Sequence, residues 1–226
     1  MHASNEHHPA FEEYCECIFE LEEDSVELIQ ARIAERLDVS RASVSEMIKR
    51  MEAEGLINLS GSRIALTEQG RRLAEGIVRK HRLAECFLID VLGLSWSTAH
   101  HEACKWEHVI TDEVAVALSK MLGNPTACPH GNPMPGSVHH EKLLTPLNTI
   151  EIGDSFTVVR ISEELEETAG ALDTLEANKM FPGKVGIISN RGNDGAVSVT
   201  MSDSANSAPM VIDSFISSRL LVSTKK

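Results

Sequence analysis

The stretch that most restricts the fold is QARIAERLDVSRASVSEMIKRMEAEGLI, residues 30–57. Apolar residues recur at helical spacing on both sides of a short break at 38–40, and Gly55 closes the second half. Ser40 has the side chain of an N-cap for a second helix over about 41–54. Two helices joined by so short a turn predict a helix-turn-helix, although a hairpin of a helical bundle would show the same pattern.

The following segment, NLSGSRIALTEQG, favours the DNA-binding alternative. It alternates through Leu59, Ile64 and Leu66 around a Gly-Ser turn and predicts a two-stranded wing with Arg63 near its tip. The formal net charge of the chain is −13, yet residues 29–80 hold ten basic residues against seven acidic ones. Phosphate contact relies on local Lys and Arg, so this segment is the part of the chain expected to face DNA.

A second pattern lies in HEACKWEHVI and the residue before it. His100, Cys104, Glu107 and His108 stand at positions i, i+4, i+7 and i+8, which a continuous helix would stack on one face. Such a face is normally apolar, whereas all four of these side chains are competent metal ligands. The spacing therefore predicts a metal-binding helix.

Two further pairs of candidate ligands stand one helical turn apart. His81 and Glu85 lie four residues apart in a long helical pattern, and His100 could join them in a second cation site. The alternative is an ordinary surface pair. Glu13 and Glu16 lie in an N-terminal helical stretch, FEEYCECIFELEE, where acidic residues are most often a solvated face.

Length, cysteine usage and hydropathy exclude several classes of protein. At 226 residues the chain can bury a core and is expected to form two or three domains. Its five cysteines show no CxxC pairing, so neither a disulfide framework nor a structural zinc finger is indicated. No apolar run approaches the ~20 residues of a membrane span, and the polar start MHASNEHHPA is no signal peptide. We expect a cytoplasmic protein with no membrane partner.

The C-terminal third of the chain lacks the helical spacing of apolar residues that the first two thirds show. Residues 127–146 are rich in Pro and Gly without helical period and predict a linker, whose histidines are expected to be exposed. Beyond it, DSFTVVRI, KVGIISNR, AVSVTMS and SRLLVS are short alternating segments separated by Gly, Asn and Ser. They predict a small all-β domain.

Four motifs together resemble the diphtheria-toxin-repressor family of metal-dependent transcriptional repressors: ARIAERL, RKHRLAE, HEACKWEHV followed by DEV, and HGNPMPG. The likeness is good over the first 140 residues or so and loose beyond. It implies a mainly α fold with a small β domain: a winged helix-turn-helix over 1–74, a helical metal-binding and dimerisation domain over 75–145 with the linker at its end, and an SH3-like β-barrel over 146–226.

The resemblance also assigns the candidate ligands to two sites. The primary, activating site takes Glu13, Glu16, Cys104, Glu107 and His108, and the ancillary site takes His81, Glu85 and His100. In the family the third domain adds a Glu and a Gln to the ancillary site. Glu167, or alternatively Glu164, could be the Glu here, but no Gln lies nearby, so this contribution is left open.

The ligand set departs from both metal types of the family. Glu13 stands where iron-type members have Met, whereas Cys104 stands where manganese-type members have a carboxylate. Oxygen ligands suit Mn²⁺ and thiolate is softer, so the set is a hybrid. We expect two ions per subunit, either Mn²⁺ or Fe²⁺.

The resemblance implies a homodimer on a palindromic double-stranded DNA operator. The recognition helix has Arg41-Ala42 and Glu46 where the iron regulators have Gly-Pro and Gln, so a different operator is expected. The expected base readers are Ser40, Ala42 and Glu46, and the expected phosphate contacts are Arg41, Ser43, Ser45, Lys49 and Arg50, with Arg63 on the wing.

The predicted function is a metal-activated repressor that senses Fe²⁺ or Mn²⁺ and controls metal-homeostasis genes, and not an enzyme. Two alternatives from other classes of protein are a metalloenzyme and a metal buffer. A metalloenzyme could hold a catalytic metal on Cys104, Glu107 and His108, but no substrate-pocket signature, phosphate loop or nucleophile motif accompanies them. A metal buffer using the His-rich start and linker would leave the winged helix unexplained.

Overall fold

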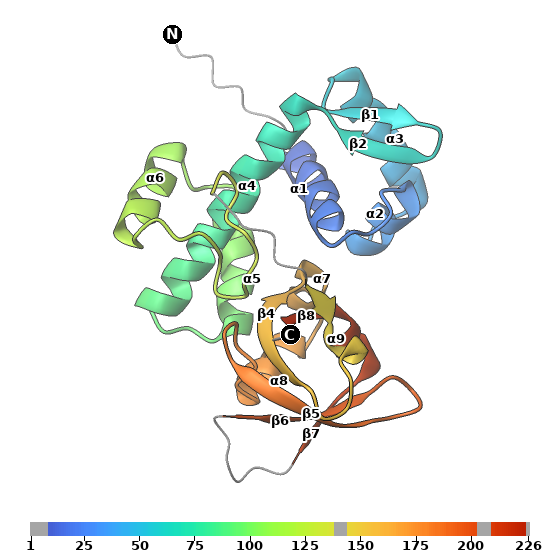
Figure 1. Cartoon of the computed structure of the whole chain (residues 1–226). Coiled ribbons are helices and arrows are strands. Elements are labelled where there is room, and N and C mark those ends of the chain that lie inside the picture. Colours follow the sequence, from blue (N-terminus) through green and yellow to red (C-terminus); the bar gives the residue numbers. More distant parts are fainter. Residues whose placement is uncertain (1–8, 138–143, 203–208, 225–226) are drawn as a thin grey trace. The chain divides into compact units, whose positions relative to one another are not determined.

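A computed structural model describes residues 9–137, 144–202 and 209–224 (Figure 1). The chain divides into two compact units: Met1–His81 with Glu107–Ile110, and Arg82–Trp106 with Thr111–Lys226. The division falls inside helix α4 (Glu68–Cys86). Among the described residues, no helix is long and apolar enough to cross a membrane.

The first unit is a helical domain with a small antiparallel hairpin. In chain order it holds α1 (Pro9–Glu23), α2 (Gln30–Arg36), α3 (Arg41–Ala53), β1 (Ile57–Ser60), β2 (Arg63–Leu66) and the first part of α4. Its core gathers fully buried side chains from each of the first three helices, among them Ile18, Ile33 and Ile48. Burial of this apolar face, rather than helix propensity alone, stabilises helices as short as α2.

The predicted helix-turn-helix and wing are confirmed. α3 begins at Arg41, and the Ser40 hydroxyl accepts a hydrogen bond from the Ser43 amide at 3.1 Å, as an N-cap does. β1 and β2 pair in antiparallel register from Ile57 opposite Leu66 to the turn, where Gly61 has a φ of +63°. A positive φ favours glycine at this tip.

A close backbone approach joins the wing to α4. A Cβ atom on Gly70 would lie 2.0 Å from the Leu56 carbonyl oxygen, so only glycine fits there. Thr67 secures the same junction, because its hydroxyl donates to the Gly55 carbonyl at 2.6 Å and accepts from the Gly70 amide at 3.1 Å. The geometry of the wing is therefore fixed by the start of α4.

The second unit combines helices with a β-sheet. After the end of α4 come a π-helical turn (Phe87–Val91), α5 (Trp96–Trp106) and α6 (Asp112–Met121). The rest contains β3 (Thr145–Pro146), a 3-10 turn (Leu147–Thr149), β4 (Ser155–Ile161), α7 (Glu163–Glu166), α8 (Ala171–Ala177), β5 (Val185–Arg191), β6 (Val197–Met201), β7 (Met210–Ile212), α9 (Ser214–Arg219) and β8 (Leu220–Ser223). Within the described residues six strands form one antiparallel sheet in the order β3-β8-β4-β5-β6-β7.

The four predicted strand segments coincide with β4, β5, β6 and β8. The expectation of an all-β domain is wrong in one respect, because the short helices α7, α8 and α9 are inserted between the strands. Apolar residues of these helices, such as Leu165 and Leu172, share one buried core with the strands. A few residues at helical spacing are too short a run to separate from a loop by periodicity alone.

The predicted linker is irregular, as expected, but its described first part is not a solvated tether. His130 and Asn132 are fully buried, and the His130 carbonyl accepts a hydrogen bond from the Ile161 amide of β4 at 2.9 Å. A Cβ atom on Gly131 would lie 2.0 Å from the Val159 carbonyl oxygen. The segment therefore packs on the sheet domain, whereas His139 and His140 of the same stretch lie outside the described residues.

Candidate metal centres and nucleic-acid interface

The first unit contains a buried cluster of metal-binding side chains, which we call the first centre. His81 Nδ1 lies 2.6 Å from Glu107 Oε2, and both side chains are buried. Glu16 of α1 joins them, with the three potential ligand atoms all within 4.8 Å of one another. An imidazole and two carboxylates held this close can share one divalent cation.

The α1 helix brings a further carboxylate to His108. Glu12 Oε2 lies 3.1 Å from His108 Nδ1, and the other ring nitrogen of His108 is 3.3 Å from Glu107 Oε1. Glu12 and Glu16 are four residues apart and therefore share one helical face. Glu13, which the sequence assigned to this site, is turned away from that face and is exposed. The structure thus brings together Glu12, Glu16, Glu107 and His108.

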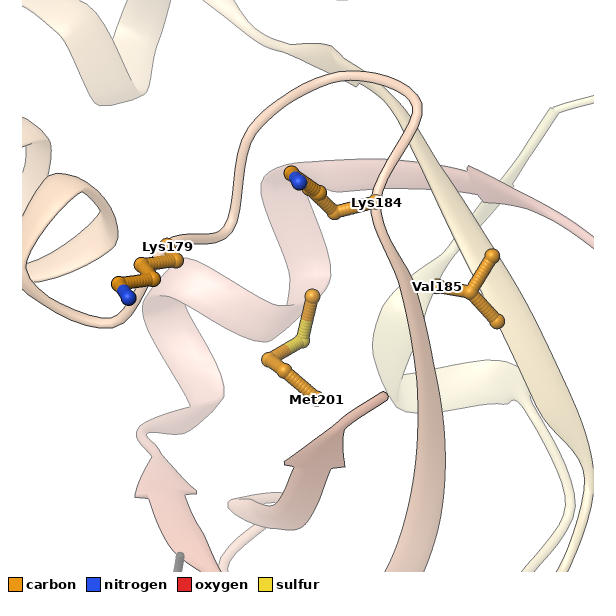
Figure 2. A pocket seen from close by; sticks show the side chains of 4 residues that line it. All are labelled: Lys179, Lys184, Val185 and Met201. Carbon is orange, nitrogen blue, oxygen red and sulfur yellow. The ribbon is translucent and has the colours of Figure 1, made fainter. Parts of the chain in front are cut away.

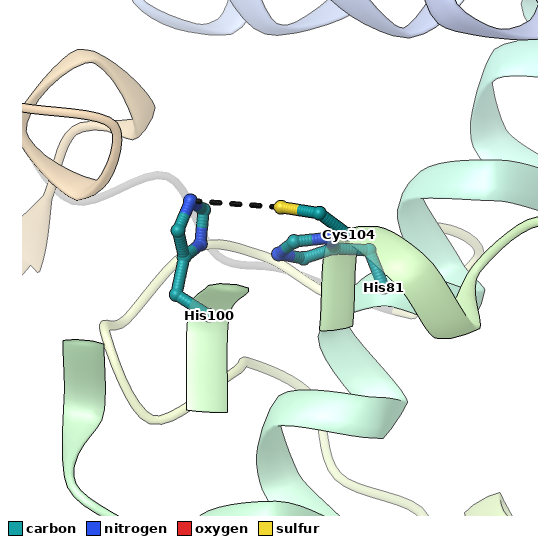
Figure 3. A group of neighbouring side chains, drawn as sticks. All are labelled: His81, His100 and Cys104. Carbon is teal, nitrogen blue, oxygen red and sulfur yellow. Dashed lines mark hydrogen bonds between the residues drawn. The ribbon is translucent and has the colours of Figure 1, made fainter. Parts of the chain in front are cut away.

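The helical stripe that the sequence predicted over His100–His108 ends early. α5 stops at Trp106, and Glu107 and His108 lie in the turn that follows, before Thr111 caps α6. On α5 itself, Cys104 Sγ and His100 Nε2 are 3.9 Å apart, one helical turn from each other (Figure 3).

The second unit contains a larger buried cluster, which we call the second centre. Glu85 Oε1 lies 3.2 Å from Nδ1 of both His100 and His130. Glu166 Oε2 lies 3.4 Å from Nδ1 of His100 and 2.8 Å from that of His130. Two carboxylates, one from α4 and one from α7, are therefore placed between two imidazoles that come from α5 and from the segment predicted as a linker.

A thiol completes the second centre. The potential ligand atoms of Cys128, His130 and Glu85 lie within 4.8 Å of one another. Burial and the Glu85 carboxylate raise the pKa of the Cys128 thiol to about 11, although neighbouring His130 acts in the opposite direction. Metal ligation requires the thiolate, so a cation would have to displace this proton.

Charge balance explains how so many ionisable groups are buried together. Burial by itself lowers the pKa of His130, but the Glu166 and Glu85 carboxylates raise it by more, so the net pKa lies well above the usual value. The pKa of His100 is raised in the same way, against burial, by its hydrogen bonds to Cys104, Glu166 and Glu85. Imidazolium protons therefore compensate the carboxylates, and a divalent cation could replace them. The imidazole, carboxylate and thiol set fits a first-row transition metal.

The two glutamates that the sequence offered for the ancillary site, Glu164 and Glu167, do not face the second centre. Glu164 pairs with Arg219, its Oε2 lying 2.7 Å from Nε, and Glu167 is exposed. The buried residues of this short helix are Glu163 and Glu166, which share its inner face at i and i+3. Sequence reasoning also missed Cys128 and His130, for which the Cys-x-His spacing in ACPHGNP was the available signal.

The predicted DNA-contacting residues lie on the outer face of α3 and on the wing. Exposed residues of this set are Ser40, Arg41, Ala42, Ser43, Glu46, Lys49, Arg50 and Arg63, and Ser45 is half-buried. The opposite face of α3 supplies Val44, Ile48 and Met51 to the core. Arg50 also stacks over the Phe11 ring at 5.3 Å. The outer face of α3 is thus polar and basic and available to the major groove.

Several apolar residues of the π-helical turn and of α6 are exposed. Val91, Leu92, Val114, Val116 and Met121 are each about half exposed or more, whereas Leu88 of the same turn is buried. Exposed apolar residues such as these are candidates for an interaction surface.

The small pocket in Figure 2 belongs to a different part of the second unit. Lys179, Lys184, Val185 and Met201 line it. None of these four side chains is a carboxylate, an imidazole or a thiol, so the pocket is no part of either centre.

Comparison with known proteins gives matches over both helical parts. Residues 8–65 match the model for the N-terminal DNA-binding domain of iron-dependent repressors, and residues 67–136 match the model for their metal-binding and dimerisation domain. Iron-dependent repressor IdeR of Mycobacterium tuberculosis (strain ATCC 25618 / H37Rv) is 52% identical over 128 residues, which cover 56% of each chain. Diphtheria toxin repressor of Corynebacterium diphtheriae is 48% identical over 126 residues, 55% of this chain and 56% of the relative. The match thus spans little more than half the length of these curated relatives.

Solved structures match over almost the whole chain. A manganese-dependent transcriptional repressor in complex with manganese has a TM-score of 0.84 at 29% identity, covering 95% of this chain and 100% of that one. The metal-dependent transcriptional regulator MtsR has a TM-score of 0.75 at 30% identity, covering 96% and 99%. With the two domain models matched in order and a 30% identical relative covered almost end to end, the chain belongs to the iron-dependent repressor family.

Proposed function

We propose that this protein is a metal-activated, DNA-binding transcriptional repressor that senses Fe²⁺ or Mn²⁺ and controls metal-homeostasis genes. The observation that carries the proposal is the coexistence, in one chain, of a winged helix-turn-helix with a basic outer face and two clusters of metal-binding side chains. The curated relatives are named iron-dependent repressors and a structural relative a manganese-dependent one, which favours a repressor over a metalloenzyme or a metal buffer.

The first centre is the activating site in this proposal. Glu16, Glu107 and His108 are assigned as ligands, with Cys104 from the preceding α5 helix. Glu12 replaces Glu13 as the second carboxylate of α1, because its oxygen already lies 3.1 Å from the His108 ring. His81 is assigned to this centre through its 2.6 Å contact with Glu107, rather than to the ancillary site.

The second centre takes the role of the ancillary site. Its proposed ligands are Glu85, His100, Cys128, His130 and Glu166, so that each subunit binds two ions in all. The first centre is dominated by carboxylates and imidazoles, which suit Mn²⁺ and Fe²⁺. The second centre likewise combines carboxylates and imidazoles with one thiol, that of the buried Cys128.

The switch follows from the position of α1. This helix carries Glu12 and Glu16 on one face and packs its other faces into the core of the DNA-binding unit. Glu12, Glu16 and Glu107 would hold a divalent cation, whose positive charge would compensate these carboxylates. The carboxylates held in this way would fix α1 against the Glu107 turn, and the acidic cluster would no longer repel DNA.

The remaining parts of the proposal concern assembly. Two copies form a homodimer through the apolar surface around Val91, Leu92, Val114 and Val116 and present two winged helices to a palindromic operator. The six-stranded sheet with its inserted helices is assigned to the SH3-like barrel class.

The test is binding to a fluorescent fragment of the protein's own promoter, followed by anisotropy with chelator, with Mn²⁺, and with Fe²⁺ under anaerobic conditions. We expect tight binding only with metal, and its loss in Lys49→Ala but not in Lys179→Ala, since Lys179 lies in the sheet domain. Equal affinity with chelator and with metal would contradict a metal-activated repressor. Metal binding without any DNA binding would instead support the buffer or enzyme alternatives.

A further inference from the structure

A chain of three buried side chains leads away from the second centre. The Asn132 amide donates to Glu166 Oε1 at 2.5 Å, and Asn132 Oδ1 accepts a hydrogen bond from Arg160 Nε of β4. Asn132 is fully buried, and Arg160 and Glu166 are each exposed by less than a tenth. One carboxylate oxygen of Glu166 is thereby held by Asn132, while the other faces His100 and His130.

The two buried carboxylates of α7, Glu163 and Glu166, have different partners. Glu163 is neutralised by the fully buried Arg82, whose guanidinium lies 2.5 Å from Glu163 Oε1 and also donates to the Pro133 carbonyl at 2.5 Å. Glu166 instead contacts a neutral amide, with the guanidinium of Arg160 one residue further away. The Oε1 atom of Glu166 is therefore bonded by an uncharged group, whereas Glu163 is paired directly with a guanidinium.

An amide is the side chain that this arrangement requires. It offers a donor and an acceptor in one plane, so it can bond a carboxylate on one side and a guanidinium on the other. A carboxylate at this position would face Glu166 with like charge, and an aliphatic side chain would leave both buried partners without their bond.

We propose that Asn132 is a positioning residue for the second centre, which fixes Glu166 with one oxygen directed at the two imidazoles. The role rests on the proposed function, in that the second centre must bind a cation. Groups that hold a ligand in place typically affect metal affinity by about 10- to 100-fold when removed. The effect should fall on the second centre and leave the first unchanged, because the Asn132 side chain bonds Glu166 of the second centre and Arg160 of β4, neither of which belongs to the first centre.

The experiment is anaerobic Co²⁺ titration of the full-length protein, followed by the visible absorption of Co²⁺ and by competition with a chelator. For Asn132→Ala we expect the second Co²⁺ to bind about 10- to 100-fold more weakly, with an altered ligand-field spectrum, and the first to bind as in the wild type. Asn178→Ala is the matched control, because Asn178 is a half-buried amide whose side chain donates to the Thr174 carbonyl at the end of its own helix, α8. This variant should bind both Co²⁺ ions with the affinity and the absorption spectrum of the wild type.

A double-mutant cycle with Glu166→Gln separates positioning from general stability. If Asn132 acts through Glu166, the double variant should bind the second Co²⁺ no more weakly than Glu166→Gln alone. Additive losses, or equal weakening of both ions, would overturn the proposal. Should Asn132→Ala fail to fold, Asn132→Ser keeps a hydroxyl for Arg160 but lacks the amide, and the same weakening is expected.

The outcomes also distinguish failure of the Asn132 role from failure of the proposed metal site. Weakening by Glu166→Gln without weakening by either Asn132 variant would leave the second centre in place and overturn the positioning role. Absence of any effect of Glu166→Gln would remove Glu166 from the second centre, and the role of Asn132 with it, whereas failure of the wild type to bind a second Co²⁺ would remove the centre itself.

Discussion

Glu12 and Glu13 offer a sharp test of how α1 contributes to metal activation. The structure places Glu12 3.1 Å from His108 and leaves Glu13 exposed, whereas the sequence assigned Glu13 to the site. Glu12→Gln and Glu13→Gln each remove one charge without changing shape, from adjacent positions of the same helix. Any difference between them therefore reports on geometry rather than on net charge.

The expected magnitude follows from the position of Glu12. Two unit charges 4 Å apart attract by about 1 kcal/mol in water and by about 4 kcal/mol near a protein surface. The Glu12 side chain is one-fifth exposed, so an intermediate value of about 2 kcal/mol applies to its attraction for a cation at His108. Since about 1.4 kcal/mol corresponds to a factor of ten, Glu12→Gln should raise the metal concentration for half-activation about 30-fold.

The assay is metal-dependent anisotropy on promoter DNA with Mn²⁺ and with Fe²⁺. Glu13→Gln should shift half-activation by less than a factor of about two, as expected of an exposed carboxylate. A large shift in Glu13→Gln with a normal Glu12→Gln variant would refute the reasoning and restore the assignment made from the sequence.

Three other changes have definite expected outcomes. Cys104→Glu makes the first centre harder and should move the ratio of half-activation concentrations toward Mn²⁺ over Fe²⁺; an unchanged ratio would exclude Cys104 as a ligand. Gly70→Ala places a Cβ 2.0 Å from the Leu56 carbonyl and should lower the free energy of unfolding by about 1–3 kcal/mol in urea titrations. Gly76 lies in the same helix, and a Cβ atom there would have no neighbour within 4 Å, so Gly76→Ala should raise the free energy of unfolding by about 0.5–1 kcal/mol. Equal effects of the two glycine substitutions would contradict the close approach at Gly70. In the native protein a maleimide at pH 8 should label the exposed Cys104 before the buried Cys15. Burial and nearby Glu12 raise the pKa of the Cys15 thiol to about 12 and keep it protonated, and a protonated thiol reacts slowly. Mass spectrometry that shows Cys15 labelled as fast as Cys104 would refute this.

The sequence by itself determined the local elements. The break at 38–40, the N-cap at Ser40 and the Gly-Ser turn of the wing are signals carried by neighbouring residues, and the structure has α3, β1 and β2 at those places. The same holds for four strands of the sheet domain. Periodicities of 3.6 and 2 depend only on residues close in the chain, so they can be read without knowing the fold.

The candidate metal-binding side chains likewise fall into those that the sequence identified and those that depended on packing. The sequence identified His100, Cys104, Glu107 and His108 because they lie within nine positions of one another. It could not decide between Glu12 and Glu13, since neighbouring positions of a helix differ by about 100° in direction and the direction of the site is set by packing.

Only the tertiary structure decided the second centre. Glu85, His130 and Glu166 come from α4, from an irregular segment and from α7, with more than thirty residues between each and the next. No local pattern links them. They are brought together because Gly131 lets the irregular segment approach the backbone of β4 and because the inner face of α7 is buried in the sheet domain. Such approaches depend on the three-dimensional packing of distant segments, which is why a stretch with the composition of a linker turned out to hold a buried imidazole.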